Sequence, residues 1–379
     1  MITGISVRNF KSLYDFKLQD IPAFSCLIGL NGSGKTTVLQ LFDFLGHLAQ
    51  GTTVMRGWNM AELVTAGSRS KVIPLTVDFM IGERTLRWSG SYSLEKKRVD
   101  DERISDLNAA IDLLYIDAKG CLCMGHGEGI KKTDFSLLTY SGSILPHLKI
   151  ENPLIDAVKN ELASLKSFEL LNPASLRRPS QETDEIGIGG DGLPGFLSRL
   201  TPEQSGRLLE VLKDYYPRLQ SVDVKRRQFG WKNLLVKEYQ RAVQAGHIND
   251  GLLRVLAILS QRYTNKSFLL FDEIENGINQ EIIQKLVDLL QNFDNKQVMV
   301  TTHSALVLNY LSDPIAQGGV ILLYQDEKGY THARKFFEIP QIAERLEFMS
   351  PGQVMSQTDL VDLAAKLCQE NGNGGRVEA

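Results

Sequence analysis

The sequence predicts an α/β fold in which buried strands end in chemically capable residues. Three short apolar runs, at 24–28, 268–271 and 297–301, have the length and composition of buried strands. Each leads directly into glycine, hydroxyl, acidic or imidazole groups. Because ligands of open α/β sheets bind outside the carboxyl ends of the strands, these groups are expected to form one site.

The first run leads into a glycine-rich loop, GLNGSGKT, at residues 29–36. Its glycine spacing, followed by Lys and Thr, is the pattern of a phosphate-binding loop, and a helix is predicted to follow over 36–50. Glycines let backbone N–H groups turn inward around phosphates, and the helix start presents further N–H groups. Lys35 would hold the outer phosphates and Thr36 would bind Mg²⁺. The residues predicted to contact ATP here are Gly29, Asn31, Gly32, Ser33, Gly34, Lys35, Thr36 and Thr37. A glycine-rich turn that binds nothing is the alternative.

The other two runs end in candidate catalytic residues. Asp272 would share the magnesium ion with Thr36, and Glu273 is placed to orient or deprotonate the attacking water. A strand that happens to end in two acids is the alternative. His303, about thirty residues further on, would contact the terminal phosphate and, with Glu273 and Lys35, complete the catalytic set.

The composition of the chain excludes few classes of protein. The 379 residues carry a net charge of −3, which gives no overall support for nucleic-acid binding. The four cysteines form no disulfide or zinc framework, and Cys121, Cys123 and His126 make only a weak candidate metal site. There is no signal-peptide pattern and no run of 18 apolar residues, so we expect a cytoplasmic protein that does not span a membrane.

The rest of the chain alternates between strand-like and helical patterns. An antiparallel β-layer is expected from the runs 72–80, 85–94 and 113–115, with turns at Gly82-Glu83 and around Gly120. Hairpins are expected at 221–239, around the basic residues 225–227, and over 320–337. A loop is expected at 183–195, and residues 369–379 are too polar to fold alone. Helical spacing marks 153–168, 196–200, 205–216, 251–263 and 280–293.

The motifs at 29–36, 268–273 and 301–304, in this order, resemble the ATPase heads of the ABC superfamily, on its SMC/RecF/OLD side. The opening VRNFKS at 7–12 is similar to the start of such heads. The resemblance implies an ABC-type P-loop ATPase head, with a mixed central sheet, an antiparallel β-layer and a helical lobe. It also implies one bilobed head, divided at 1–140, 141–250, 251–345 and 346–379.

The segment NDGLLR at 249–254 is similar to the signature loop of these heads, with Asn249 where serine is usual. The resemblance implies that Asn249, Asp250 and Gly251 cap ATP bound by a second copy, which gives an ATP-sandwiched homodimer or a higher oligomer. An ordinary helix cap is the alternative. Residues 274–279 resemble a loop that runs along the dimer interface. The glutamine loop of the family is not located; its region would be 139–147, where Tyr140 and Ser141 stand out.

The expected function is that of an ATP-hydrolysing switch that controls a separate effector, such as a nuclease, or a DNA transaction, in anti-phage defence. A RecF-type repair ATPase is the main alternative, and a transporter subunit is a weaker one. Residues 141–248 contain no heptads for coiled-coil arms, and the acids after His303 form no Toprim-like set. Residues 225–227 could contact DNA phosphates, or form a solvated tip. The helical spacing of Leu360, Leu363 and Leu367 predicts a docking surface within 331–368.

Overall fold

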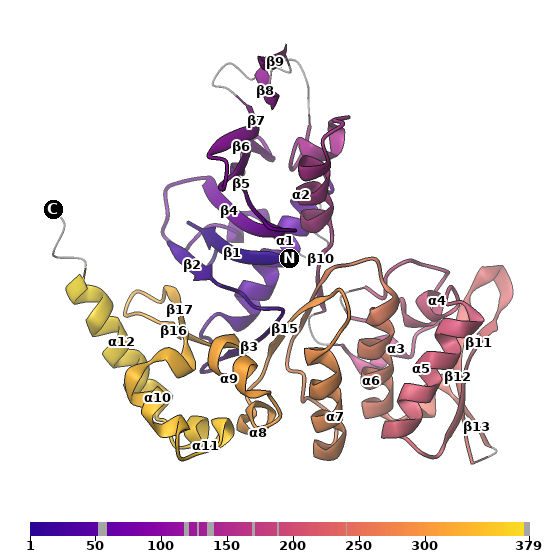
Figure 1. Ribbon diagram of the computed structural model, residues 1–379. Helices are drawn as coiled ribbons and strands as arrows, with labels where there is room; N and C mark the ends of the chain where they lie inside the picture. The colour runs from indigo at the N-terminus through magenta and orange to yellow at the C-terminus, as the bar shows by residue number, and fades with distance from the viewer. Residues whose placement is uncertain are drawn as a thin grey trace. The chain divides into compact units, whose positions relative to one another are not determined.

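The computed structural model describes residues 1–51, 59–116, 121–126, 129–134, 140–168, 171–187, 189–239 and 241–374. The chain divides into two compact units. Unit 1 comprises Met1–Lys166 and Asp313–Ala379, and unit 2 comprises Ser167–Ser312. Each is described by itself below, and the labels are those of Figure 1.

Unit 1 contains an eight-stranded sheet with the order β2-β1-β4-β5-β6-β7-β8-β9. All its neighbouring strands pair antiparallel, so the expected antiparallel layer is confirmed. The strands are β1 Ile2–Val7, β2 Phe16–Gln19, β4 Val72–Ile81, β5 Arg84–Ser93, β6 Arg98–Asp106, β7 Ile111–Ile116, β8 Cys121–His126 and β9 Gly129–Asp134. The turn at Gly82 has a φ of 61°, as a tight hairpin requires, while the turn expected around Gly120 lies outside the described residues.

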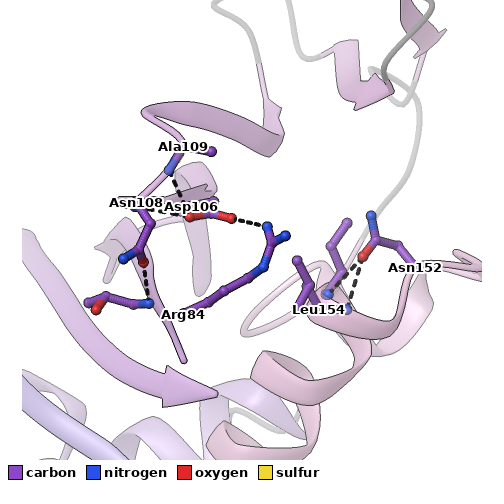
Figure 2. A network of polar contacts seen from close by, with 8 residues as sticks. Arg84, Asp106, Asn108, Ala109, Asn152 and Leu154 are labelled. Carbon is purple, nitrogen blue, oxygen red and sulfur yellow. Dashed lines mark hydrogen bonds and ion pairs between the residues drawn. The ribbon is translucent and has the colours of Figure 1, made fainter. Parts of the chain in front are cut away.

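A buried carboxylate organises the turn between β6 and β7, as Figure 2 shows. Asp106 accepts hydrogen bonds from the N–H groups of Asn108 at 3.0 Å and Ala109 at 3.1 Å, and it pairs with Arg84 at 2.6 Å. The bond from Ala109, followed by the contact with Arg84, holds the pKa of Asp106 below its ordinary value. The side chain of Asn108 accepts from the N–H of Thr85 at 2.6 Å, so the same turn is tied to the start of β5.

In the described part of its first half, unit 1 contains the helices α1 Lys35–Ala49 and α2 Pro153–Ala163. Asn152 caps α2 by accepting from Leu154 and Ile155, as Figure 2 shows. The expected helix over 153–168 is too long, because α2 ends at Ala163 and Leu165–Phe168 forms strand β10. The apolar residues at 165 and 168 are three positions apart and so continue the helical spacing, which is why the sequence pattern did not mark the change.

The strand that precedes the glycine loop, β3 Phe24–Ile28, is entirely buried and pairs parallel with β16 Val320–Gln325. β16 forms the expected late hairpin with β17 Thr331–Lys335. Short 3₁₀ helices lie at Met60–Glu62, Leu145–His147 and Phe336–Glu338. The C-terminal helices are α9 Asp313–Gly319, α10 Pro340–Leu346, α11 Pro351–Ser356 and α12 Leu360–Gly374.

Helix α12 corrects the expected docking surface. Leu363 and Leu367 are each only 3% exposed, and the helix packs against β16. The apolar stripe that we expected to dock a partner is therefore largely used inside unit 1. The helix also continues to Gly374, into the polar stretch 369–379 that we expected not to fold alone. Attachment to a packed helix supplies the nucleation that the isolated stretch lacks.

Unit 2 combines a three-stranded antiparallel sheet with a parallel strand pair. The sheet consists of β11 Leu219–Arg226, β12 Lys232–Glu238 and β13 Arg241–Gln244, which confirms the expected hairpin and adds a third strand. Strands β14 Phe268–Phe271 and β15 Gln297–Thr301 are fully buried and pair in parallel, as expected. The helices are α3 Pro173–Leu176, α4 Leu193–Leu197, α5 Pro202–Tyr215, α6 Asp250–Ser260, α7 Gln280–Gln291 and α8 Ala305–Leu308, with 3₁₀ turns at Gln228–Gly230, Ala245–His247 and Gln261–Tyr263.

The helix starts in unit 2 follow local signals. Thr201 caps α5 and forms a reciprocal capping box with Gln204, so the helix begins at Pro202, three residues before the expected run 205–216. The helix expected at 196–200 instead begins at Leu193, because Pro194 suits the first helical turn. This shortens the loop expected at 183–195. Among the described residues, none of the helices of either unit is long and apolar enough to cross a bilayer.

Candidate functional site

The glycine loop of unit 1 has the backbone that a phosphate cradle requires. Gly29, Gly32 and Gly34 have φ angles of 146°, 82° and 102°, a region that other residues rarely adopt. A Cβ on Gly29 would lie 2.3 Å from the carbonyl oxygen of Leu323, and one on Gly34 would lie 2.4 Å from Oγ1 of Thr331. Glycine is therefore required at both positions by packing as well as by conformation.

The polar groups of the loop are arranged for an anion. Lys35 is 6% exposed, and its Nζ donates to the carbonyl oxygens of Gly29 and Leu30, each at 2.9 Å. The Oγ of Ser33 is buried and has no hydrogen-bond partner among the described residues. Gly34 stands at the N-cap of α1, so no side chain of that residue covers the first N–H groups of the helix. A buried hydroxyl without a partner among the described residues, a held ammonium and a helix start without a side-chain cap together fit a phosphate chain.

The remaining predicted residues of this loop lie toward solvent. Asn31, Gly32 and Thr36 are exposed, and Thr37 is half-buried in the first turn of α1. The Thr36 hydroxyl sits at the start of the helix, where the magnesium ligand of a phosphate loop is needed. The structure thus brings together, within unit 1, all the residues of the predicted loop.

The opening segment at 7–12 contacts this loop through Thr331. Ser12 accepts from the N–H of Thr331 at 2.8 Å, and the hydroxyls of the two residues lie 2.9 Å apart. Thr331 is the residue that packs against Gly34. Lys11, which has a φ of 49°, reaches Oε1 of Gln40 on α1 at 2.5 Å. Thr331 was missed by sequence reasoning, because nothing local marks a threonine on a distant strand as a support of the loop.

In unit 2, one threonine holds both predicted acids. Thr301, at the end of β15, donates through Oγ1 to Oδ1 of Asp272 and accepts the N–H of Glu273 at 2.8 Å. Glu273 has a φ of 46°, a strained conformation for a residue with a side chain, and its carboxylate accepts from Nδ2 of Asn276 at 3.1 Å. The parallel pairing of β14 and β15 brings Thr301 to the acids, so the geometry depends on both strands.

The segment that carries His303 is positioned by Glu275. The carboxylate of Glu275 accepts from Oγ1 of Thr302 and from the backbone N–H of His303, each at 2.8 Å. His303 itself is exposed, with its backbone fixed and its imidazole at the surface of unit 2. The structure therefore brings His303 to the same edge as Asp272 and Glu273, immediately after the neighbouring strand.

The segment 249–251 forms the start of α6. Oδ1 of Asn249 accepts from the N–H of Leu252 at 3.2 Å, so the helix cap that we considered as the alternative is present. Asp250 pairs with Arg177, which also donates to the carbonyl oxygen of Ile248 at 2.6 Å. A Cβ added to Gly251 would lie 3.0 Å from the carbonyl oxygen of Gly277. The signature-like segment and the loop 274–279 thus lie side by side in unit 2.

Arg254 connects the signature-like helix with the acids. It lines a small cavity together with Glu273 and Ile274. Burial lowers the pKa of Arg254, while the charges of Asp250 and Glu273 oppose that shift. Its Nε has no hydrogen-bond partner among the described residues. A half-buried guanidinium within the field of Glu273 therefore links the helix start to the predicted catalytic carboxylate.

Two other predicted regions behave differently. Within 139–147, Ser143 and the N–H of Ile144 bind the buried carboxylate of Glu102, at 2.5 and 2.9 Å. Tyr140 donates to the carbonyl oxygen of Val99. Ser141 has no such role in the structure, residue 139 is outside the described part, and the glutamine loop stays a prediction. No metal-binding cluster of His, Cys, Asp and Glu occurs among the described residues, and the side chains of Cys121 and His126 are not among those described.

Two protein-family models match adjacent parts of the chain. The model described as "AAA ATPase domain" matches residues 1–139, and the model described as "AAA domain, putative AbiEii toxin, Type IV TA system" matches residues 133–309. The first contains the glycine loop, and the second contains the acids, His303 and the signature-like segment. The two models together therefore span both sets of site residues.

Curated relatives are distant. The "ATP/GTP phosphatase" of Helicobacter pylori is 21% identical over 90% of this chain and 93% of that protein. The "DNA replication and repair protein RecF" of Edwardsiella ictaluri is 24% identical over 35% of this chain, and that of Haemophilus influenzae is 28% identical over the same share. The chain covers 37% of the length of the Edwardsiella RecF protein, little more than a third.

Solved structures show the fold. An SMC head bound to the C-winged helix domain of ScpA matches with a TM-score of 0.53 and 16% identity, over 88% of this chain and 96% of that chain. An SMC head domain with an extended coiled coil from Pyrococcus furiosus matches with a TM-score of 0.53 and 13% identity, over 91% and 99%. The fold is that of SMC heads, and together with the two AAA ATPase family models and the RecF relatives it supports an SMC/RecF-like ATPase head of the ABC type.

Proposed function

We propose that the protein binds and hydrolyses ATP and uses the cycle as a conformational switch. The observation that carries this proposal is the glycine loop of unit 1. It combines three positive φ angles, a buried Lys35 held inside the loop and a buried Ser33 hydroxyl without a partner among the described residues. These are the features of a cradle for a phosphate chain rather than of an ordinary turn.

Each group of predicted residues is proposed to have its own part in the chemistry. Lys35 and the loop N–H groups hold the phosphates, which places the transferred group. Glu273, anchored by Thr301, orients and deprotonates the attacking water, and His303 donates to charge that develops on the terminal phosphate. Thr36 and Asp272 are each proposed as a magnesium ligand, and the ion would neutralise charge on the phosphates when bound.

The proposed switch requires a second copy of the chain. Asn249, Asp250 and Gly251 form a helix start, and such a start suits an anion. Gly251 packs against the loop that follows the acids. A contact between Gly251 and ATP bound by a second copy could therefore change the position of that loop and of Glu273. ATP binding then favours a closed dimer, and hydrolysis releases it.

The decisive variant is Glu273→Gln. It keeps the size and hydrogen-bonding ability of the side chain but removes the general base, so turnover is expected to fall by about 10²-fold or more while ATP binding is retained. Glu281→Gln, at the exposed start of α7, is the matched control and should leave turnover unchanged. ATP hydrolysis and ATP affinity are measured for both, and sedimentation with and without ATP measures the dimer.

Retained turnover in Glu273→Gln would remove the catalytic assignment. A variant that binds ATP tightly but sediments as a monomer would contradict the sandwich while leaving the nucleotide site intact. The two parts of the proposal therefore fail separately.

For the output of the switch, we propose control of a separate effector, such as a nuclease, in defence against phage. The family model whose description names a toxin system supports a role of this kind. The RecF relatives favour the second candidate, a DNA repair ATPase, over the part of the chain that they match. Identification of the protein that co-purifies with the full chain separates these outputs, since an effector protein supports the first and repair factors support the second.

A further inference from the structure

The tip of the β11–β12 hairpin carries aromatic side chains that the ATPase chemistry does not use. We call residues 225–232 the basic-aromatic tip. Phe229 is 89% exposed and Trp231 is 42% exposed, which is unusual for large apolar side chains. Both belong to unit 2 and lie between the paired residues Arg226 and Lys232.

The tip has a defined backbone. The N–H of Arg227 donates to the carbonyl oxygen of Trp231 at 2.7 Å, which closes the turn. Within it, Phe229 has a φ of 56° and Gly230 one of 79°. A left-handed phenylalanine is strained, so the turn holds the ring outward at a conformational cost. Strain of this kind concentrates at functional positions.

An open hollow of about 680 Å³ lies beside Trp231. Its lining residues are Pro179, Arg226, Arg227, Gln228 and Trp231. The lining therefore combines an indole, a proline and two guanidinium groups. The volume of the hollow lies in the range of small-molecule sites. The hydrogen bond between Ser180 and Lys232, at 2.7 Å, fixes the wall that carries Pro179.

The charged side chains of the tip are all positive. Lys225, Arg226 and Arg227 are exposed, and none of the three forms an ion pair with another described residue. Lys232 has one acidic neighbour, Glu182, at 3.7 Å. The sequence from 224 to 237 contains no acid at all, although the chain as a whole has a charge of −3. The positive potential is therefore local, and it coincides with the exposed rings.

We propose that the basic-aromatic tip binds single-stranded nucleic acid. Unpaired bases would stack on Phe229 and Trp231, and Arg226, Arg227 and Lys225 would hold the adjoining phosphates. A ring that projects from the surface meets bases only where they are unstacked, so the tip favours a single strand over a duplex. A purely solvated basic turn explains the cations but gives no reason for a strained, exposed phenylalanine. The proposal does not depend on ATP hydrolysis.

The test uses the full chain without nucleotide and a fluorescein-labelled oligothymidylate of about 15 nucleotides, a length at the upper end of known binding sites. Fluorescence anisotropy measures its affinity and that of a duplex of the same length. Phe229→Ala is expected to weaken single-strand binding about 5- to 150-fold, the range for loss of one stacked base. Phe348→Ala is the matched control, because Phe348 of unit 1 is 85% exposed. It should leave the affinity unchanged.

Two further measurements separate stacking from charge. Arg226→Glu with Arg227→Glu should weaken binding and reduce its dependence on salt, by about 0.7 in the logarithmic slope for each phosphate that the variant no longer neutralises. The fluorescence of Trp231 should be quenched by the oligonucleotide, and this quenching should disappear in Trp231→Phe.

Equal affinities for Phe229→Ala and Phe348→Ala would overturn the stacking proposal, as would an equal loss for single strand and duplex. Absence of oligonucleotide binding by the wild type at low salt would overturn it as well, and would favour a protein partner for the tip. Phe229 has little contact with the interior, so a folding defect is not expected to obscure these outcomes.

Discussion

Replacing Thr301 by valine tests whether the predicted catalytic acids are held by tertiary structure. Thr301 is fully buried at the end of β15, and its hydroxyl is shared between the carboxylate of Asp272 and the N–H of Glu273. Valine keeps the branched shape but has no hydroxyl. The carboxylate loses a donor, and the N–H of a residue with a φ of 46° loses its acceptor.

The expected loss of stability follows from these two bonds. A hydrogen bond to a charged group contributes about 1.5–3 kcal/mol, and an unsatisfied N–H costs about 1–3 kcal/mol. Since both groups are only partly buried, water recovers some of this loss, and we expect the free energy of unfolding to fall by about 2–3 kcal/mol. Urea denaturation measures the change.

The variant is also expected to lose activity. Glu273 is free to leave its left-handed conformation, which costs about 1–3 kcal/mol to maintain, once its anchor is removed. A displacement of about 1 Å in a positioned catalytic group can reduce the rate about 100-fold, so kcat for ATP hydrolysis should fall by that order. ATP affinity should change little, because Lys35 and the glycine loop belong to unit 1.

Ser260→Ala provides the control. Ser260 is also fully buried in unit 2, but its hydroxyl donates to the helix carbonyl oxygen of Ala257 at 2.8 Å. This variant should lose about 1 kcal/mol of stability and keep its turnover. A Thr301→Val protein that hydrolyses ATP within twofold of the wild-type rate would refute the anchoring role.

Two further predictions concern unit 1. Burial raises the pKa of Glu102 above its ordinary 4.5, against the hydrogen bonds from Ser143, Ile144 and Trp88. Its contribution to stability is therefore complete below about pH 4.5 and is lost as the pH rises through the raised pKa. Relative to Glu102→Gln, the wild type should lose stability between these values in urea titrations at several pH values, and a parallel pH dependence of the two proteins would contradict the assignment. Gly34→Ala should destabilise the protein by at least about 1 kcal/mol more than Gly32→Ala, because only the former also meets Thr331; equal thermal unfolding of the two would disprove this packing role.

The predicted strands were confirmed where the alternation between apolar and polar residues was clear. β4 and β5 alternate between buried and exposed residues, and both appeared at the expected positions. β6 was missed because two of its buried residues are the acids Glu102 and Asp106. Buried acids satisfied by tertiary partners break the apolar pattern on which strand prediction depends.

The sequence allows the candidate site residues to be proposed, but it does not identify the residues that hold them. The glycine loop, Asp272 and Glu273 belong to local motifs that can be read from neighbouring positions. Thr331 meets Ser12 across 319 positions of the sequence, and Glu275 binds the backbone of His303 across 28. Such contacts depend on strand pairing, so local patterns contain no signal for them.

The departure at Asn249 illustrates how the cap and the nucleotide interpretations fit together. An amide has a carbonyl oxygen that accepts and an NH₂ group that donates. In the structure, Oδ1 of Asn249 caps α6 through the N–H of Leu252, which leaves the NH₂ group as the chemically distinct donor of the same side chain. A serine in this place would use its one oxygen for both tasks. Because asparagine assigns the two tasks to different atoms, the observed helix cap does not count against a contact with the phosphates of a second copy's ATP.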